Sequence, residues 1–196
     1  MHYPKCIALS GAPCTGKTTA LKGLAAEFGD RILVVPEIAS FVFAAQLYPP
    51  ATELANHNFV VAISQLRMAL EDMALLQRSR LQNLDAIIVD RAVHDAAAYL
   101  NGGIDELAAV VGTSTKALHA RYEHVLFFTL PPPHILLAHW PSNDNRIDPI
   151  DIAKKLDERT LATWKSHTSV AIMPPTDVWE ERYAVVSRTL HDLIGD

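Results

Sequence analysis

Ten residues near the start of the chain have the types and spacing of a loop that holds phosphate groups. Residues 10–19 read SGAPCTGKTT, in which Gly11, Gly16, Lys17 and Thr18 fit the pattern G-x-x-x-x-G-K-S/T. The glycines let the backbone turn so that successive N–H groups converge on phosphate oxygens. A helix that begins after them directs its positive end at the same anion. The sequence therefore predicts a nucleotide phosphate site here.

The side chains of this loop suit a magnesium nucleotide. We expect Lys17 to contact the β- and γ-phosphates and the Thr18 hydroxyl to ligate Mg²⁺. A dinucleotide-binding loop would need glycine at position 13, where the chain has proline, so that alternative is excluded. The expected cofactor-binding residues are Gly11, Ala12, Pro13, Cys14, Thr15, Gly16, Lys17, Thr18 and Thr19.

The residues that follow the apolar run AIIVD favour ATP as the nucleotide and transfer as the reaction. GTPases read guanine through an Asn-Lys-x-Asp segment, which this chain lacks. A mechanical ATPase usually has a glutamate that polarises water after the aspartate of such a run, whereas Asp90 is followed by Arg91. We therefore expect ATP and Mg²⁺ as cofactors and a small hydroxylated molecule, nucleoside-like or another metabolite, as acceptor. An ATP-dependent regulatory module or an ATPase is the alternative.

Three charged side chains stand where apolar runs end. Glu37 follows the run RILVVP, Asp90 closes the run AIIVD, and Arg91 comes next. In open parallel sheets, ligands bind beyond the carboxyl ends of the strands. If these runs are parallel strands, the three side chains face one crevice together with Lys17. The sequence then predicts one site for two substrates.

Each of the three side chains has a chemical role and a plainer alternative. Glu37 can accept or orient a hydroxyl proton, or it can suit the positive end of a helix. Asp90 can hold Mg²⁺ together with Thr18, or it can cap the next helix. Arg91 can offset charge on the transferring phosphoryl group, or it can pair with Asp95 one turn on. We adopt the chemical role in each case.

Four segments of the chain together resemble the NadR-like AAA/kinase domains of the P-loop kinase group and, more distantly, the deoxynucleoside kinases. The resemblance rests on GAPCTGKTT (11–19), VVPEIAS (34–40), DRAVHDAAAY (90–99) and the arginine of NDNRID (143–148). It implies phosphotransfer chemistry with Glu37 as the base. The chain departs from the deoxynucleoside kinases at Ala92, where their motif has serine.

The resemblance also implies residues around the acceptor. A lid arginine falls on Arg146, which we count as catalytic, with Arg159 as the competitor, and a substrate-contacting glutamine falls on Gln65. Phe41 lies on a segment that would form a wall of the acceptor site, where a ring could stack on it. For Gln65 and Phe41 the alternatives are ordinary hydrogen bonding and core packing.

The order of apolar runs predicts the fold that positions these residues. Runs at 6–10, 31–36, 86–90, 124–130 and 169–173 alternate with helical stretches, among them 17–28, 53–82, 92–100 and 177–194. This alternation is typical of α/β proteins with a parallel sheet. We expect a three-layer α/β/α P-loop NTPase with five parallel strands in the order 2-3-1-4-5. Residues 1–196 should form one domain, with a helical lid at about 139–165.

Composition narrows the range of partners. The net charge is −5, and the 17 Lys and Arg residues are scattered, which argues against nucleic acid or an anionic membrane as a partner. Two cysteines cannot form a disulfide framework, and no apolar stretch is long enough for a membrane span. We expect a cytoplasmic protein whose partners are ATP and the acceptor, and we leave a homodimer open.

Overall fold

The apolar runs form the parallel strands of one sheet. The computed structural model describes residues 4–47, 53–79, 83–139 and 149–195. Its strands run in the order β2-β3-β1-β4-β5, which confirms the predicted α/β fold and strand order. They are β1 (Lys5–Ser10), β2 (Ile32–Val35), β3 (Ala86–Asp90), β4 (His124–Phe128) and β5 (Val170–Met173).

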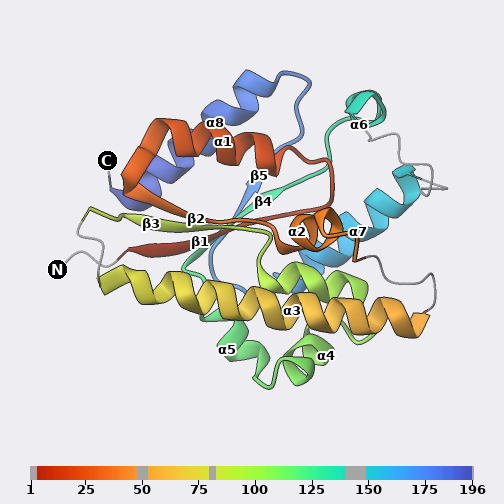
Figure 1. Ribbon diagram of the computed structural model, residues 1–196. Coiled ribbons are helices and arrows are strands. Elements are labelled where there is room, and N and C mark those ends of the chain that lie inside the picture. Colours follow the sequence, from red (N-terminus) through yellow and green to blue (C-terminus); the bar gives the residue numbers. More distant parts are fainter. Residues whose placement is uncertain (1–3, 48–52, 80–82, 140–148, 196) are drawn as a thin grey trace.

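Helices cover both faces of this sheet (Figure 1). On one face lie α1 (Lys17–Phe28) and α8 (Trp179–Ile194), and on the other lie α3 (Glu53–Leu75), α4 (Gly103–Val110) and α5 (Thr115–His119). Toward the carboxyl ends of the strands lie α2 (Ile38–Ala44), α6 (Pro133–His139) and α7 (Pro149–Thr163). Short 3-10 helices complete the order: η1 (Gly29–Arg31), η2 (Leu76–Ser79) and η3 (Val93–Tyr99).

The two faces of the sheet bury separate cores. Alternate residues of β1 show the division: Ile7 and Leu9 pack toward α1 and α8, whereas Cys6 and Ala8 pack toward α3. Because both faces are covered, the strands are apolar at nearly every position, as parallel strands usually are. Burial raises the pKa of the Cys6 thiol to about 12, so that thiol is neutral. Among the helices of the described residues, none has the length and apolar character that crossing a membrane requires.

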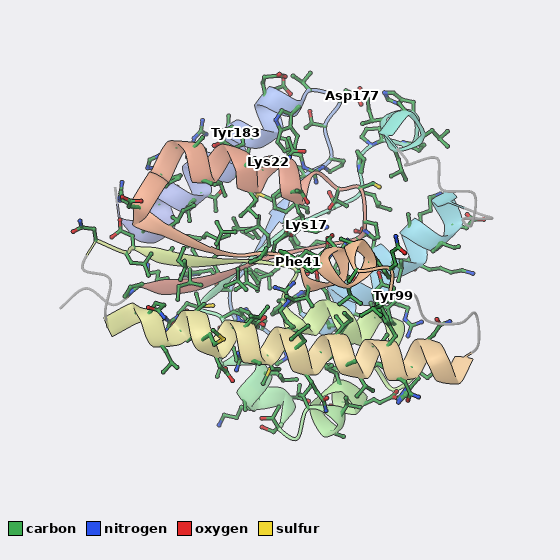
Figure 2. The ribbon with its side chains drawn as sticks, in the orientation of Figure 1. Lys17, Lys22, Phe41, Tyr99, Asp177 and Tyr183 are labelled. Carbon is green, nitrogen blue, oxygen red and sulfur yellow. The ribbon has the colours of Figure 1, made fainter. Side chains whose placement is uncertain are left out.

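A glycine lets α1 and α8 pack closely. A β-carbon at Gly23 would overlap the ring of Tyr183, which lies against α1 (Figure 2). Further along α1, Glu27 accepts hydrogen bonds from the hydroxyls of Tyr183 and Ser187, each at 2.6 Å. The helix that carries the phosphate loop is therefore held tightly to the C-terminal helix.

We expect Gly23→Ala to destabilise the protein by about 1–3 kcal/mol, because the Tyr183 ring must move to admit the methyl group. In a Tyr183→Ala background the same change should stabilise the protein by up to about 1 kcal/mol, since alanine favours a helix interior over glycine. Urea denaturation of the four proteins measures both effects. Equal destabilisation in the two backgrounds would contradict this packing.

Candidate active site

The phosphate loop, residues 11–18, joins the end of β1 to the first turn of α1. Gly11 and Gly16 have φ angles of +129° and +91°, which residues with a side chain rarely adopt. A β-carbon at Gly11 would overlap the carbonyl oxygen of Phe128 on β4, and one at Gly16 would lie 2.7 Å from the ring of Trp179. Both positions therefore require glycine for their conformation and for space.

Lys17 is buried beneath the loop and bonds to it. Its Nζ donates to the carbonyl oxygens of Gly11 at 2.8 Å and Ala12 at 2.6 Å, and to the hydroxyl of Thr15 at 3.0 Å. Burial and the nearby charge of Arg91 lower the pKa of Lys17 to about 7. A phosphate group entering the loop would bring further negative charge next to Lys17 and so favour its charged form.

We expect MgATP binding at pH 8 to be accompanied by uptake of a proton. In the free protein Lys17 is largely neutral there because its pKa is about 7, whereas contact with phosphate favours the charged form. Calorimetry in buffers of different ionisation enthalpy counts the protons taken up. The uptake should disappear in Lys17→Met, and wild-type binding without any uptake would contradict the assignment.

A cavity of about 840 Å³ opens beside the phosphate loop. Residues of the loop, of α2 and α3, and of the segment after β3 form its walls. Phe43, Phe59 and Tyr99 provide aromatic surface, and the rings of Phe43 and Phe59 stack with their centroids 5.4 Å apart. The cavity thus has a phosphate end and an aromatic end.

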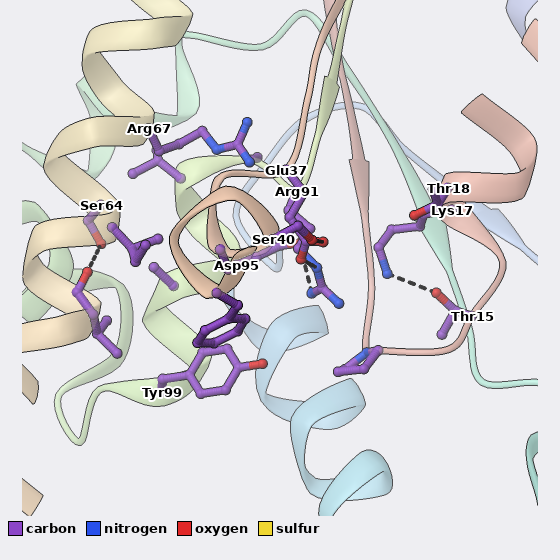
Figure 3. A pocket seen from close by; sticks show the side chains of 18 of the residues that line it. Thr15, Lys17, Thr18, Glu37, Ser40, Ser64, Arg67, Arg91, Asp95 and Tyr99 are labelled. Atoms are coloured by element: carbon purple, nitrogen blue, oxygen red, sulfur yellow. Dashed lines mark hydrogen bonds and ion pairs between the residues drawn. The ribbon is translucent and has the colours of Figure 1, made fainter. Parts of the chain in front are cut away.

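Glu37 and Arg91 form an ion pair in the wall of this cavity (Figure 3). The Nε of Arg91 pairs with Oε1 of Glu37, and the Ser40 hydroxyl donates to Oε2 at 2.8 Å. Burial opposes the charge of Glu37, but Arg91 and Ser40 outweigh it and hold the pKa of Glu37 below its ordinary value. The fold therefore brings Lys17, Glu37 and Arg91 to one cavity.

Asp90 and Thr18 offer oxygen atoms of the kind that Mg²⁺ takes. Asp90 ends β3 and is buried, which raises the pKa of its carboxyl, while Lys17 nearby acts in the opposite direction. Thr18 is exposed and lines the cavity. Within the described residues, no three His, Cys, Asp or Glu side chains gather into a metal-binding cluster. Thr18 lines the cavity and Asp90 does not, and Mg²⁺ in nucleotide sites takes only one or two ligands from the protein and the others from phosphate and water.

The two other residues predicted to bind substrate lie outside the cavity walls. Gln65 is exposed on α3, and Phe41 on α2 is 60% exposed. Neither lines the cavity, whereas their neighbours Ser64 and Phe43 do. On α3 and on α2, the residue that lines the cavity is therefore one or two positions away from the residue that was predicted to bind substrate.

Of the two arginines considered for the lid, the structure describes one. Arg146 lies outside the described residues. Arg159 on α7 donates from Nη2 to the carbonyl oxygen of Leu100, just beyond η3. Arg159 is not among the residues that line the cavity.

Arg67 is a cavity residue that was not identified from the sequence. It is 3% exposed and donates at 2.8 Å to the carbonyl oxygens of Pro36 and Asp90. It therefore ties the segment that carries Glu37 to the segment that carries Arg91. Its spacing from Val60 and Ser64 along one helical face was the available signal.

Comparison with known proteins assigns the chain to a family. The model of the AAA domain family matches residues 6–182, which is most of the chain. The chain belongs to the AAA domain family. No curated protein matches the sequence of this AAA domain.

Solved structures of NadR protein share the fold of this AAA domain. One, in complex with NAD and AMP-PNP, superposes with a TM-score of 0.66 at 15% identity, covering 100% of this chain and 51% of the other. A second, in complex with NR, has a TM-score of 0.64 at 14% identity, covering 100% and 52%. This AAA domain thus spans about half the length of those chains. The likeness confirms the predicted P-loop NTPase architecture of NadR-like type.

Proposed function

We propose that this protein transfers the γ-phosphate of MgATP to the hydroxyl group of a small acceptor. The observation that carries the proposal is the ion pair of Glu37 and Arg91, which lines the same cavity as Lys17. Hydrolysis needs only a water molecule beside the phosphates. A carboxylate and a guanidinium facing a cavity of about 840 Å³ fit a second, larger substrate.

The proposed transfer assigns each residue a step. Lys17 and the amides of the phosphate loop hold the β- and γ-phosphates. Thr18 and Asp90 would hold Mg²⁺, which offsets charge on the phosphate oxygens. The acceptor oxygen bonds to the γ-phosphorus, the bond from that phosphorus to the β,γ-bridging oxygen breaks, and ADP leaves. Glu37 takes the proton of the acceptor hydroxyl.

Arg91 links the two halves of this reaction. While it pairs with Glu37 it keeps that carboxylate ionised but only weakly basic, because it holds the pKa low. Charge that develops on the transferring phosphoryl group attracts the guanidinium. As Arg91 turns toward that charge, Glu37 becomes a better base at the moment when the proton must be accepted.

The aromatic end of the cavity supports an acceptor that carries a flat ring. Phe43, Phe59 and Tyr99 offer ring faces and edges, and such surfaces favour stacking. NadR protein has been solved with NR bound, so NR belongs among the molecules to be tested. A cytoplasmic location and a homodimer stay predictions.

The proposal is tested by following ADP release from MgATP in the presence of nucleosides, NR, sugars and amino-alcohols, each added separately. We expect one ring-bearing compound to accelerate ADP release and to appear as its phosphate ester by mass spectrometry. ADP release at the same rate with every compound would show hydrolysis instead. Tight binding of MgATP with no release would favour a regulatory module.

A further inference from the structure

Asp95 is a buried carboxylate of the cavity to which the proposed transfer gives no role. It lies in η3, lines the cavity and is only 4% exposed. Within the described part of the chain its Oδ2 atom has no hydrogen-bond partner. A buried acceptor without a partner is costly, so this oxygen is poised to receive a donor or a cation.

Arg91 is the nearest cation to that oxygen. Its Nη1 lies 4.0 Å from Oδ2 of Asp95, while its Nε pairs with Glu37. The same Nη1 donates to the carbonyl oxygen of Gly11 at 3.3 Å, at the start of the phosphate loop. One guanidinium therefore interacts with two carboxylates. It contacts Glu37 directly and lies just beyond hydrogen-bonding distance of Asp95.

Two hydrogen bonds hold the other oxygen of Asp95 in place. The hydroxyl of Ser10 donates to Oδ1, and the indole Nε1 of Trp164 donates to that hydroxyl at 2.7 Å. Trp164 follows α7 directly, and its ring stacks on His94 with centroids 4.0 Å apart. Because Ser10, Asp95 and Trp164 are all buried, this chain of bonds fixes the carboxylate against both β1 and α7.

Three cations favour the charged form of Asp95, which is the form that can anchor a guanidinium. Burial raises the pKa of its carboxyl to about 6, while Arg91 and the hydrogen bond from Ser10 act to lower it. The cations that face it from the surrounding elements are Arg91 after β3, Lys17 of α1 and Arg67 of α3. Lys17 and Arg67 already have oxygen partners, at the phosphate loop and at Pro36 and Asp90.

We propose that Asp95 is a positioning residue that holds Arg91 toward the γ-phosphate of a bound nucleoside triphosphate. The inference rests on the proposed function, in which Glu37 must release Arg91 to act on the acceptor. A guanidinium that loses one carboxylate keeps its direction if a second, rigid one stands beside it. Asp95 is that second carboxylate, and Ser10 and Trp164 supply the rigidity.

The test compares the affinities of MgADP and MgAMP-PNP, which differ by the γ-phosphoryl group. In Asp95→Asn we expect the Kd of MgAMP-PNP to rise about tenfold while that of MgADP stays within about twofold. A merely structural role would weaken both nucleotides together. Equal weakening, or no change in either Kd, would overturn the proposal.

A second variant keeps the test decisive if Asp95→Asn does not fold. Ser10→Ala leaves every charge in place but removes the hydroxyl that holds Asp95, so the same selective loss is expected at about threefold. Unchanged selectivity in Ser10→Ala would then overturn the proposal. Asp30→Asn, an exposed change in η1, is the matched control and should alter neither affinity.

This measurement separates the inference from the proposed function. It uses nucleotides alone, so it gives a result even if no acceptor accelerates ADP release. A selective loss without any acceptor would keep the role of Asp95 and remove phosphotransfer to a small molecule.

Discussion

Replacing Glu37 by glutamine is expected to lower acceptor-stimulated turnover by about 10²- to 10⁴-fold, while the Kd of MgATP stays within about threefold. Glutamine keeps the size of the side chain and can still accept a hydrogen bond from Ser40, but it cannot take the proton of the acceptor hydroxyl. It also frees Arg91 from its ion pair, so the phosphates should bind no less tightly. Steady-state ADP release with the identified acceptor, and calorimetry with MgATP, measure the two effects.

The matched control for this change is Glu158→Gln. Glu158 is exposed on α7 and does not line the cavity, so the variant loses one carboxylate of the same type without touching the site. We expect its turnover to equal that of the wild type. Undiminished turnover in Glu37→Gln would remove Glu37 from the reaction.

Replacing Lys17 by methionine is expected to reduce turnover by about 10²- to 10³-fold and to weaken MgATP binding. The amino group of Lys17 lies under the phosphate loop, where it bonds to Gly11, Ala12 and Thr15, and contact with phosphate favours its charged form. Methionine has a similar length but no charge. The loop amides alone then face the phosphates, and the developing charge on the γ-phosphoryl group is less well offset.

Lys22→Met is the matched control for Lys17→Met. Lys22 is exposed on the same helix, five residues further along, and it does not line the cavity (Figure 2). Both variants should keep the thermal stability needed for assay, and Lys22→Met should keep wild-type affinity and turnover. If Lys17→Met retained wild-type affinity for MgATP, the loop would not be a nucleotide site.

Much of the fold could be predicted because parallel strands buried on both faces are continuous apolar runs. The run 124–130 was predicted slightly too long, since β4 ends at Phe128. Helix α6, which begins at the last of the three prolines 131–133, was not predicted from the sequence. Proline favours the first turn of a helix, where its missing N–H is not needed, and Pro133 begins α6 in that way.

Which residues of α2 and α3 face the cavity could not be predicted in the same way. Gln65 and Arg67 are two positions apart on α3, yet one is exposed and the other lies against the cavity. On α2, Phe41 and Phe43 are both exposed, yet only Phe43 lines the cavity. Which face of a short or largely apolar helix turns inward depends on what it packs against, and a single sequence does not contain that information.

The sequence by itself determined the phosphate loop, because its glycines, Lys17 and Thr18 act on a phosphate within one short, contiguous turn. It also determined that Glu37 and Arg91 each come shortly after a strand, because each follows its own apolar run. Only the tertiary structure decided how the charges pair. Arg91 stands between Glu37 and Asp95, and Asp95 is held by Ser10, whose hydroxyl accepts a hydrogen bond from Trp164, 154 residues after Ser10 in the chain. Contacts over such distances depend on the order of strands and the seating of α7, which local patterns of residues do not specify.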